Sequence, residues 1–198
     1  SCAAHGNKLF VIGGRDREQP ETALNTIYML DTTPDTDNMK WVSLPPFPGE
    51  GRILSTAAVC DSTLFIIGGC SLSRDNSGET SRTYLSDMIG YDMTSKDPSK
   101  WGSSGRQQLA GPGMPVAAAA GPAPVRENSI LLIGGDKRGN SPDPSRPVAQ
   151  SRDILVYDVI GNTWTRQGEW PVGIATVPAV VRGSEIMTIS GETAPGVR

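Results

Sequence analysis

Two side chains close to the end of the 198-residue sequence combine a proton acceptor with a cation. Glu192 directly follows Ile189-Ser190-Gly191, and Arg198 comes six residues later, after Pro195-Gly196. A carboxylate and a guanidinium held on one turn suit proton transfer beside an anionic substrate, because the first accepts the proton and the second pairs with the anion. The same two residues could equally form an ordinary salt bridge within a loop, and the residues alone leave both interpretations open.

Arg52 is a second candidate for contact with an anionic substrate. It stands in the step Gly51-Arg52, which leads into a strand of small residues, and a guanidinium fork matches the geometry of a carboxylate. The alternative is a structural role, in which the guanidinium donates hydrogen bonds to backbone carbonyls of a neighbouring repeat. The pair Arg152-Asp153 is expected to stabilise a loop.

The sequence has few residues of the types that bind metals or cofactors. His5 is the one histidine, so neither a zinc cluster nor a copper site of the galactose oxidase type has its ligands, and we expect no cofactor and no metal. The three cysteines (Cys2, Cys60 and Cys70) are best interpreted as small apolar residues. Cys60 and Cys70 are predicted at opposite ends of paired strands, roughly 20 Å apart, so they should not form a disulfide.

The charge balance excludes one large class of partner. With 18 Lys and Arg against 21 Asp and Glu, the net charge is −3 and the isoelectric point is about 5.2, so we expect no nucleic-acid partner. No apolar run approaches the roughly 18 residues of a membrane span, and no signal segment opens the chain. The sequence begins at Ser1 without Met, from which we expect a processed piece or a fragment of a longer protein.

An apolar segment that ends in Gly-Gly recurs along the chain and predicts buried strands. The second glycines of the four copies are 55, 66 and 56 residues apart, near the roughly 50-residue kelch period. Each run is short and rich in β-branched residues, which favours a strand over a helix. The copies are Leu9–Gly14, Leu64–Gly69, Ile130–Gly135 and the weaker Ile186–Gly191.

Three further strands accompany these segments in a fixed order. Strands that end in an apolar-Asp step follow the first three copies, and each is followed by a tryptophan (Ile27–Asp31 with Trp41, Met88–Asp92 with Trp101, Ile154–Asp158 with Trp164). Strands of small residues precede the later copies at Ser55–Val59, Val116–Ala120 and Ala175–Val181. Polar insertions are expected as loops at 15–25, 70–83 and 136–150. Four antiparallel strands in this order form a propeller blade.

This combination resembles the kelch repeat. The resemblance implies an all-β fold, a kelch-type β-propeller with four-stranded antiparallel blades, in a single unit over residues 1–198. The repeats are placed at about 3–52, 53–114 and 115–173, with a partial one at 174–198. These supply about three and a half blades, the first of them partial, whereas a ring needs roughly four to eight. We therefore expect missing blades or a second polypeptide to complete a probable six-bladed ring.

Strand direction predicts where chemistry can occur. Because strands alternate in direction, residues just after Gly-Gly (Arg15, Cys70, Asp136 and Glu192) share one end of the propeller with residues that follow the tryptophan strands (Arg52, Met114 and Gly173). Near the axis this end forms a funnel.

The turn from Ser190 to Arg198 resembles the active-site turn of the N-acetylneuraminate epimerase (sialic acid mutarotase) family, and the whole chain resembles its cyclically permuted type. Supporting segments are Ala23–Thr26, Leu44–Arg52, Tyr84–Asp87 and Ser151–Ile154. The resemblance implies that Glu192 is the proton acceptor, that Arg198 is an essential arginine that binds the substrate carboxylate, and that a small acidic sugar is the partner. Arg52 is the next substrate-binding candidate. The resemblance also implies an isomerase in the periplasm or otherwise exported.

A second function from another class stays open. Most kelch domains grip a partner protein with the funnel, and the fold does not fix the function. A non-catalytic interaction module would have arginines and serines in the funnel without a dedicated carboxylate. The fourth repeat also departs from the pattern, since Ser190 stands where the other repeats have the first glycine.

Overall fold

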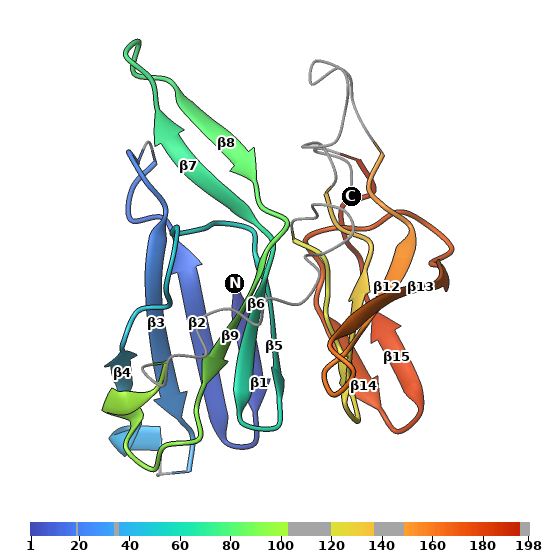
Figure 1. The fold of residues 1–198 in the computed structure, drawn as a ribbon, viewed down its shortest axis with the longest axis horizontal. Coiled ribbons are helices and arrows are strands. Elements are labelled where there is room, and N and C mark those ends of the chain that lie inside the picture. Colours follow the sequence, from blue (N-terminus) through green and yellow to red (C-terminus); the bar gives the residue numbers. More distant parts are fainter. Residues whose placement is uncertain (19, 34–35, 103–119, 137–148, 195–198) are drawn as a thin grey trace.

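Antiparallel hairpins, packed face to face around a common axis, make up the computed structural model of the chain (Figure 1). It describes residues 1–18, 20–33, 36–102, 120–136 and 149–194. Two short 3-10 helices, η1 (Thr36–Asn38) and η2 (Pro98–Lys100), lie in connections between strands. Blades below are numbered in chain order.

Blade 1 has all four strands, although the sequence predicted only part of a blade here. They pair in the order β1 (Cys2–His5), β2 (Lys8–Gly14), β3 (Leu24–Asp31) and β4 (Trp41–Leu44). The sheet follows the alternation of β2, in which Phe10 and Ile12 are buried and Leu9 and Val11 are exposed. One face of blade 1 therefore packs against blade 2, and the other face, which is also apolar, is exposed.

Blade 2 contains an inserted hairpin where the sequence predicted a loop. Its sheet is β5 (Thr56–Cys60), β6 (Thr63–Ile67) and β9 (Met88–Asp92), and residues 103–119 after it lie outside the described residues. The segment predicted as a loop at 70–83 is a hairpin of β7 (Cys70–Arg74) and β8 (Thr80–Tyr84), which projects from one end of the propeller in Figure 1. The polar residues misled the prediction because both faces of a projecting hairpin meet water along most of its length.

Blade 3 corrects the position predicted for an inner strand. Its order is β10 (Val125–Arg126), β11 (Ser129–Ile133), β12 (Asp153–Asp158) and β13 (Thr163–Glu169). The partner of β11 is the segment directly before its turn, not Val116–Ala120, of which only Ala120 is described. The carbonyls of Pro122 and Pro124 accept from Ile133 and Leu131 (3.0 Å each). Because proline has no N–H, these pairs lack the return bond, which hides the strand from a sequence reading.

The fourth repeat supplies the two strands that were predicted for it. β14 (Ala179–Arg182) pairs with β15 (Glu185–Thr188). Ile186 packs toward blade 3, whereas Val180 and Met187, paired on the other face, are exposed. This half-blade therefore has an apolar outer face like that of blade 1.

The glycine pairs have the backbone conformation that glycine favours. All three complete pairs have positive φ at both residues, for example 67° at Gly134 and 98° at Gly135. Ser190 adopts the same conformation with φ of 66°, so the fourth repeat keeps the turn despite its side chain. A Cβ at Gly134 would overlap the carbonyl oxygen of Ile174, in the connection to the next repeat. The pair thus lets neighbouring repeats approach closely.

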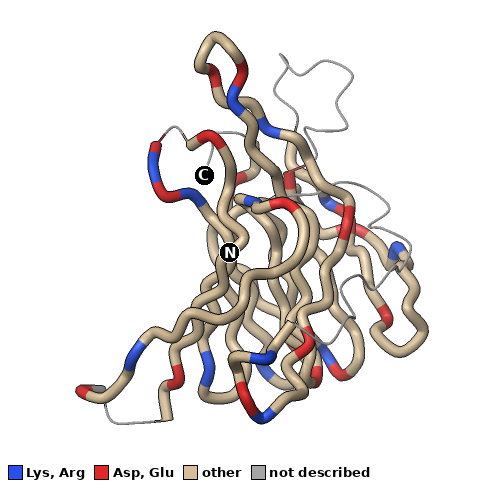
Figure 2. The backbone as a smooth tube through the Cα atoms, turned by 60° about the vertical axis from the view of Figure 1, so that its left-hand side comes forward, with Lys and Arg blue, Asp and Glu red and all other residues tan. Residues whose placement is uncertain are grey.

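The hydrophobic core lies between blades, as expected for sheets stacked face to face. One cluster joins Phe10 and Ile12 of blade 1 to Leu64 and Tyr91 of blade 2, and equivalent clusters join blade 2 to blade 3 and blade 3 to the half-blade. Charged residues gather at turns and strand ends, as Figure 2 shows along the tube. Burial of these faces holds each repeat to the next.

Tryptophans and tyrosines fill only part of the space between blades. The rings of Tyr157 and Trp164 pack with centroids 5.1 Å apart, and Tyr91 and Trp101 are buried. Trp41 is 52% exposed on the outer face of blade 1, and no described residue covers that face.

Inner strands of the four repeats surround a central cavity of about 1420 Å³. Its lining includes the small-residue segments Ser1–Ala4, Ser55–Val59 and Gly121–Pro124. At one end, equivalent residues of successive connections are joined by backbone hydrogen bonds: Ala120 donates to Leu54 (2.5 Å) and Thr176 donates to Ala120 (2.8 Å). All three residues have φ between 53° and 57°. These connections therefore form a rigid arc around the axis.

Candidate functional site

The first residue after each glycine pair defines a rim at the end of the propeller from which the β7–β8 hairpin projects. The rim residues are Arg15, Cys70, Asp136 and Glu192. Connections between repeats lie between them: Gly135 donates to the Ile174 carbonyl (2.7 Å), and Ala175 exchanges two backbone bonds with Glu192 (2.9 Å each). The structure thus brings Asp136 and Glu192 to either side of one connection, as the strand directions predicted.

Glu192 is a half-buried carboxylate on a fixed backbone. Its own N–H and C=O both bond to Ala175, and the hydroxyl of Thr176 donates to its Oε2 (3.4 Å). Thr176 is one of the residues that line the central cavity, so the carboxylate contacts a lining residue of that space without lining it itself. A carboxylate held in this way can exchange a proton with a bound molecule without rearrangement of the backbone.

Arg52 has a different environment from the one predicted for a substrate ligand. Its side chain is 1% exposed, and its guanidinium forms a bidentate pair with Asp87 (2.8 and 3.0 Å) and donates to the Gly68 carbonyl (3.0 Å). The guanidinium also lies 5.7 Å from the centre of the Phe47 ring. These contacts match the structural alternative, a link from the first connection to blade 2, and do not support a substrate contact by Arg52.

The other predicted site residues divide into two groups. Arg198 and Met114 lie outside the described residues, so the arginine of the predicted catalytic turn stays a prediction. The pair Arg152-Asp153 joins the edge of blade 3, where Arg152 pairs with Glu169 (3.3 Å) and Asp153 pairs with Arg166 (2.8 Å). Cys60 and Cys70 are both buried and neither forms a disulfide, as predicted.

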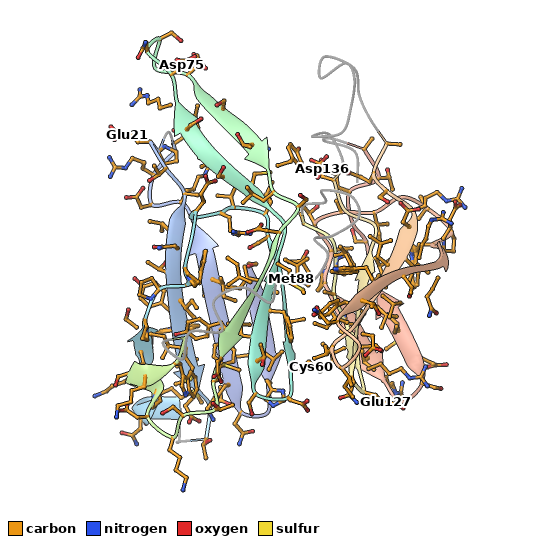
Figure 3. All side chains as sticks on the ribbon, in the orientation of Figure 1. Glu21, Cys60, Asp75, Met88, Glu127 and Asp136 are labelled. Carbon is orange, nitrogen blue, oxygen red and sulfur yellow. The ribbon has the colours of Figure 1, made fainter. Side chains whose placement is uncertain are left out.

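Two rim contacts were not predicted from the sequence. Asp136 is 4% exposed and accepts a hydrogen bond from the Tyr84 hydroxyl (3.0 Å), which ties the hairpin of blade 2 to blade 3. In Figure 3, Asp136 lies on the side of blade 3 that faces blade 2, near the base of the hairpin. Gln150 is equally buried, and its backbone N–H donates to the Thr193 carbonyl, next to Glu192 (3.2 Å). A comparison of the residues that precede each third strand would have drawn attention to both.

The described part of the chain has neither a membrane-spanning helix nor a metal-binding cluster. No helix there has the length and apolarity needed to cross a membrane. In the same residues, no group of three or more His, Cys, Asp or Glu side chains is placed to hold a metal ion.

Comparisons with known proteins agree with this architecture. The Kelch motif matches residues 1–48. An N-acetylneuraminate epimerase of Yersinia enterocolitica is 23% identical over 197 residues, which cover 86% of this chain and 47% of that protein. A kelch repeat and BTB domain-containing protein 2 of cowpox virus is 27% identical over 167 residues, covering 80% of this chain and 25% of that protein. The chain spans about half the length of the epimerase relatives it matches.

The fold also matches a solved structure. The structure of YjhT superposes with a TM-score of 0.70 over 98% of this chain and 58% of that one, at 21% sequence identity. This likeness concerns the fold. Together with the kelch motif and the epimerase relatives, it supports a kelch β-propeller similar to that of the N-acetylneuraminate epimerases.

Proposed function

We propose that the complete protein accelerates the interconversion of the α and β anomers of N-acetylneuraminate, with Glu192 as the acid-base residue. The observation that carries this proposal is that Glu192 is half-buried at the rim, with its backbone fixed by Ala175 and its carboxylate in contact with Thr176, which lines the central cavity. The names of several relatives supply the substrate class. The carbohydrate isomerase class follows from the same names.

The chemistry needs one group that removes a proton and returns it. Glu192 takes the proton from the anomeric hydroxyl, the bond between the anomeric carbon and the ring oxygen breaks, and the carboxylic acid form of Glu192 gives its proton to the ring oxygen. The open keto form then recloses on its other face by the reverse steps. One carboxylate can serve in both directions, because after the first transfer it is a carboxylic acid.

The negative charge of the sugar requires a cation in the same pocket. Arg198 is the proposed partner of the substrate carboxylate, since a guanidinium binds a carboxylate through two parallel hydrogen bonds. Arg52 is not part of the proposed site because Asp87 and Gly68 occupy its donors.

Replacement of Glu192 tests the proposal in the complete protein. Glu192→Gln keeps the shape and should lower the enzymatic rate of anomer exchange about 100-fold or more, within the usual contribution of a general acid-base residue. The rate is measured by NMR on freshly released α-N-acetylneuraminate. Glu185→Gln is the matched control, an exposed glutamate of β15 in the same repeat, and should keep the wild-type rate. A wild-type rate equal to that of buffer would remove the enzyme proposal altogether.

The second candidate is a non-catalytic kelch module that grips a partner protein on the rim. The cowpox relative combines kelch repeats with a BTB domain, and here the β7–β8 hairpin projects beside the rim. This function predicts a complete protein that leaves the anomer rate at its value in buffer and retains a protein partner in the Glu192→Gln variant.

A further inference from the structure

The repeats place Ala23, Tyr84 and Gln150 at equivalent positions around the rim. Leu85 donates to Gly69 and Ser151 donates to Gly135 (2.9 Å each), and Leu24 pairs with Gly14. The residue before each of these three therefore occupies the same position, near the end of the segment that joins the second and third strands of its blade, and in blade 2 it is the last residue of β8.

Two of these residues meet the rim segment of the next repeat. Tyr84 of blade 2 donates its hydroxyl proton to Asp136, the rim residue of blade 3. Gln150 of blade 3 donates its backbone N–H to Thr193, which follows Glu192, the rim residue of the fourth repeat. Gly173 lets this approach occur, since a Cβ there would overlap the Gln150 carbonyl oxygen. Tyr84 and Gln150 thus each contact the rim segment of the following repeat, Tyr84 through its side chain and Gln150 through its backbone.

The side chain of Gln150 differs from that of Tyr84 in one respect. It is 4% exposed, and its Oε1 is buried without a hydrogen-bond partner. A buried carboxamide oxygen without a partner destabilises the folded protein, so its presence requires an explanation. Blade 1 has Ala23 at this position, which shows that the fold accommodates an apolar residue there.

We propose that Gln150 is a ligand-binding residue of the Glu192 site, and that its carboxamide bonds a hydroxyl or amide group of the sugar. The side chain of Tyr84 is used in its contact with Asp136, whereas the side-chain oxygen of Gln150 has no partner and is available to a molecule bound at the rim. A polyhydroxylated acidic sugar fits, because a carboxamide both donates and accepts. This inference rests on the proposed function for the identity of the sugar.

Substitution by an apolar residue of similar length separates a ligand-binding role from a structural one. In the complete protein, Gln150→Met should raise the KM for N-acetylneuraminate about tenfold and change kcat less than about twofold, as for one lost hydrogen bond. Its thermal midpoint should be equal to or above the wild-type value, because the substitution removes a polar group without a partner. Gln167→Met, at an exposed position of β13, should leave KM unchanged.

A second variant and a direct binding measurement keep the test decisive. Gln150→Glu preserves the size of the side chain and places a negative charge beside an anionic sugar, so it should weaken binding further. Wild-type KM in both Gln150 variants, or a fall in their thermal midpoints with unchanged affinity, would overturn the inference and leave the proposed function intact. If the wild-type protein binds N-acetylneuraminate by calorimetry without accelerating exchange, weaker binding by Gln150→Met supports the inference while the catalytic proposal fails. Absence of binding to the wild type would overturn both.

Discussion

Two equivalent carboxylates of neighbouring blades, Asp87 and Asp153, are paired with arginines in very different environments. The carbonyl of each accepts from the first glycine of its pair (2.9 Å), which establishes the equivalence. The partner of Asp87 is Arg52, whose guanidinium is buried, whereas the partner of Asp153 is Arg166, which is half-exposed. The aspartate at this position therefore holds a connection between blades in blade 2, and in blade 3 it forms an ion pair at the surface edge of the sheet.

This contrast predicts unequal effects on stability. Arg52→Met should lower the free energy of unfolding by about 3 kcal/mol, because Asp87 loses a buried charged partner and the Gly68 carbonyl loses a donor. Arg166→Met should cost less than about 1 kcal/mol, as is usual for an exposed ion pair. Urea denaturation of the complete protein measures both. Equal costs would contradict the structural role of Arg52.

The sequence indicated the acid at position 192 but did not separate the roles of the arginines. Glu192 stands at a strand end whose position follows from a repeating local pattern, so its place on the rim was predictable. Arg52 stands in a segment whose composition suggested a substrate contact, yet its role depends on Asp87, which is 35 residues away. Distance along the chain hides such a pair from any local reading.

At the scale of elements, the glycine turns are where strands of one repeat meet the connection to the next. They require a left-handed backbone, and at Gly134 the approach of Ile174 adds a steric reason. Ser190 has the same φ without the same residue type, so the fourth turn carries a conformational cost of about 1–2 kcal/mol.

Opposite substitutions at these two turns should have opposite effects. Ser190→Gly should raise the free energy of unfolding of the complete protein by about 1 kcal/mol, since it relieves the left-handed backbone. Gly134→Ala should lower it by at least about 2 kcal/mol, because its Cβ meets both the strained φ and the Ile174 carbonyl. Differential scanning calorimetry checks both signs. A neutral Gly134→Ala variant would mean that the turn has another conformation in solution.

The hairpin β7–β8 and the inner strand of blade 3 show where element prediction failed. Hydrophobic periodicity identifies strands with one buried face, and the hairpin has little such periodicity beyond Cys70 and Leu72. Two prolines, Pro122 and Pro124, directly precede the inner strand β10, so the alanine-rich stretch before them looked more like a strand. Pairing with β11 through the turn at residues 127–128 decides its position, and that pairing is a contact between segments.

At the scale of the whole molecule, the outermost repeats have apolar faces that no described residue covers. On blade 1 these are Leu9, Val11, Tyr28 and Trp41, and on the half-blade they are Val180, Met187 and Ile189. Both faces lie on sheets whose opposite sides form the core. Since the epimerase relatives are about twice as long, we expect both faces to be covered by further blades.

A charge on these faces should act differently in the short chain and in the complete protein. Val11→Lys or Val180→Lys should reduce concentration-dependent association of the 198-residue chain, measured by analytical ultracentrifugation, because it interrupts an exposed apolar sheet face. In the complete protein the same substitutions should lower the free energy of unfolding by about 2 kcal/mol, because lysine would then be buried. Full tolerance of lysine in the complete protein would show that these faces stay exposed.

The sequence by itself determined the repeat, its strand order, the glycine turns and the carboxylate at the fourth rim position. These follow from local backbone preference and from hydrophobic alternation, both of which act over a few residues. Only the tertiary structure decided that Arg52 is an internal link, that Tyr84 and Asp136 join two blades, and that Gln150 lies beside the Glu192 segment. These facts depend on which connection packs against which strand end, and that packing is set by the stacking of whole blades.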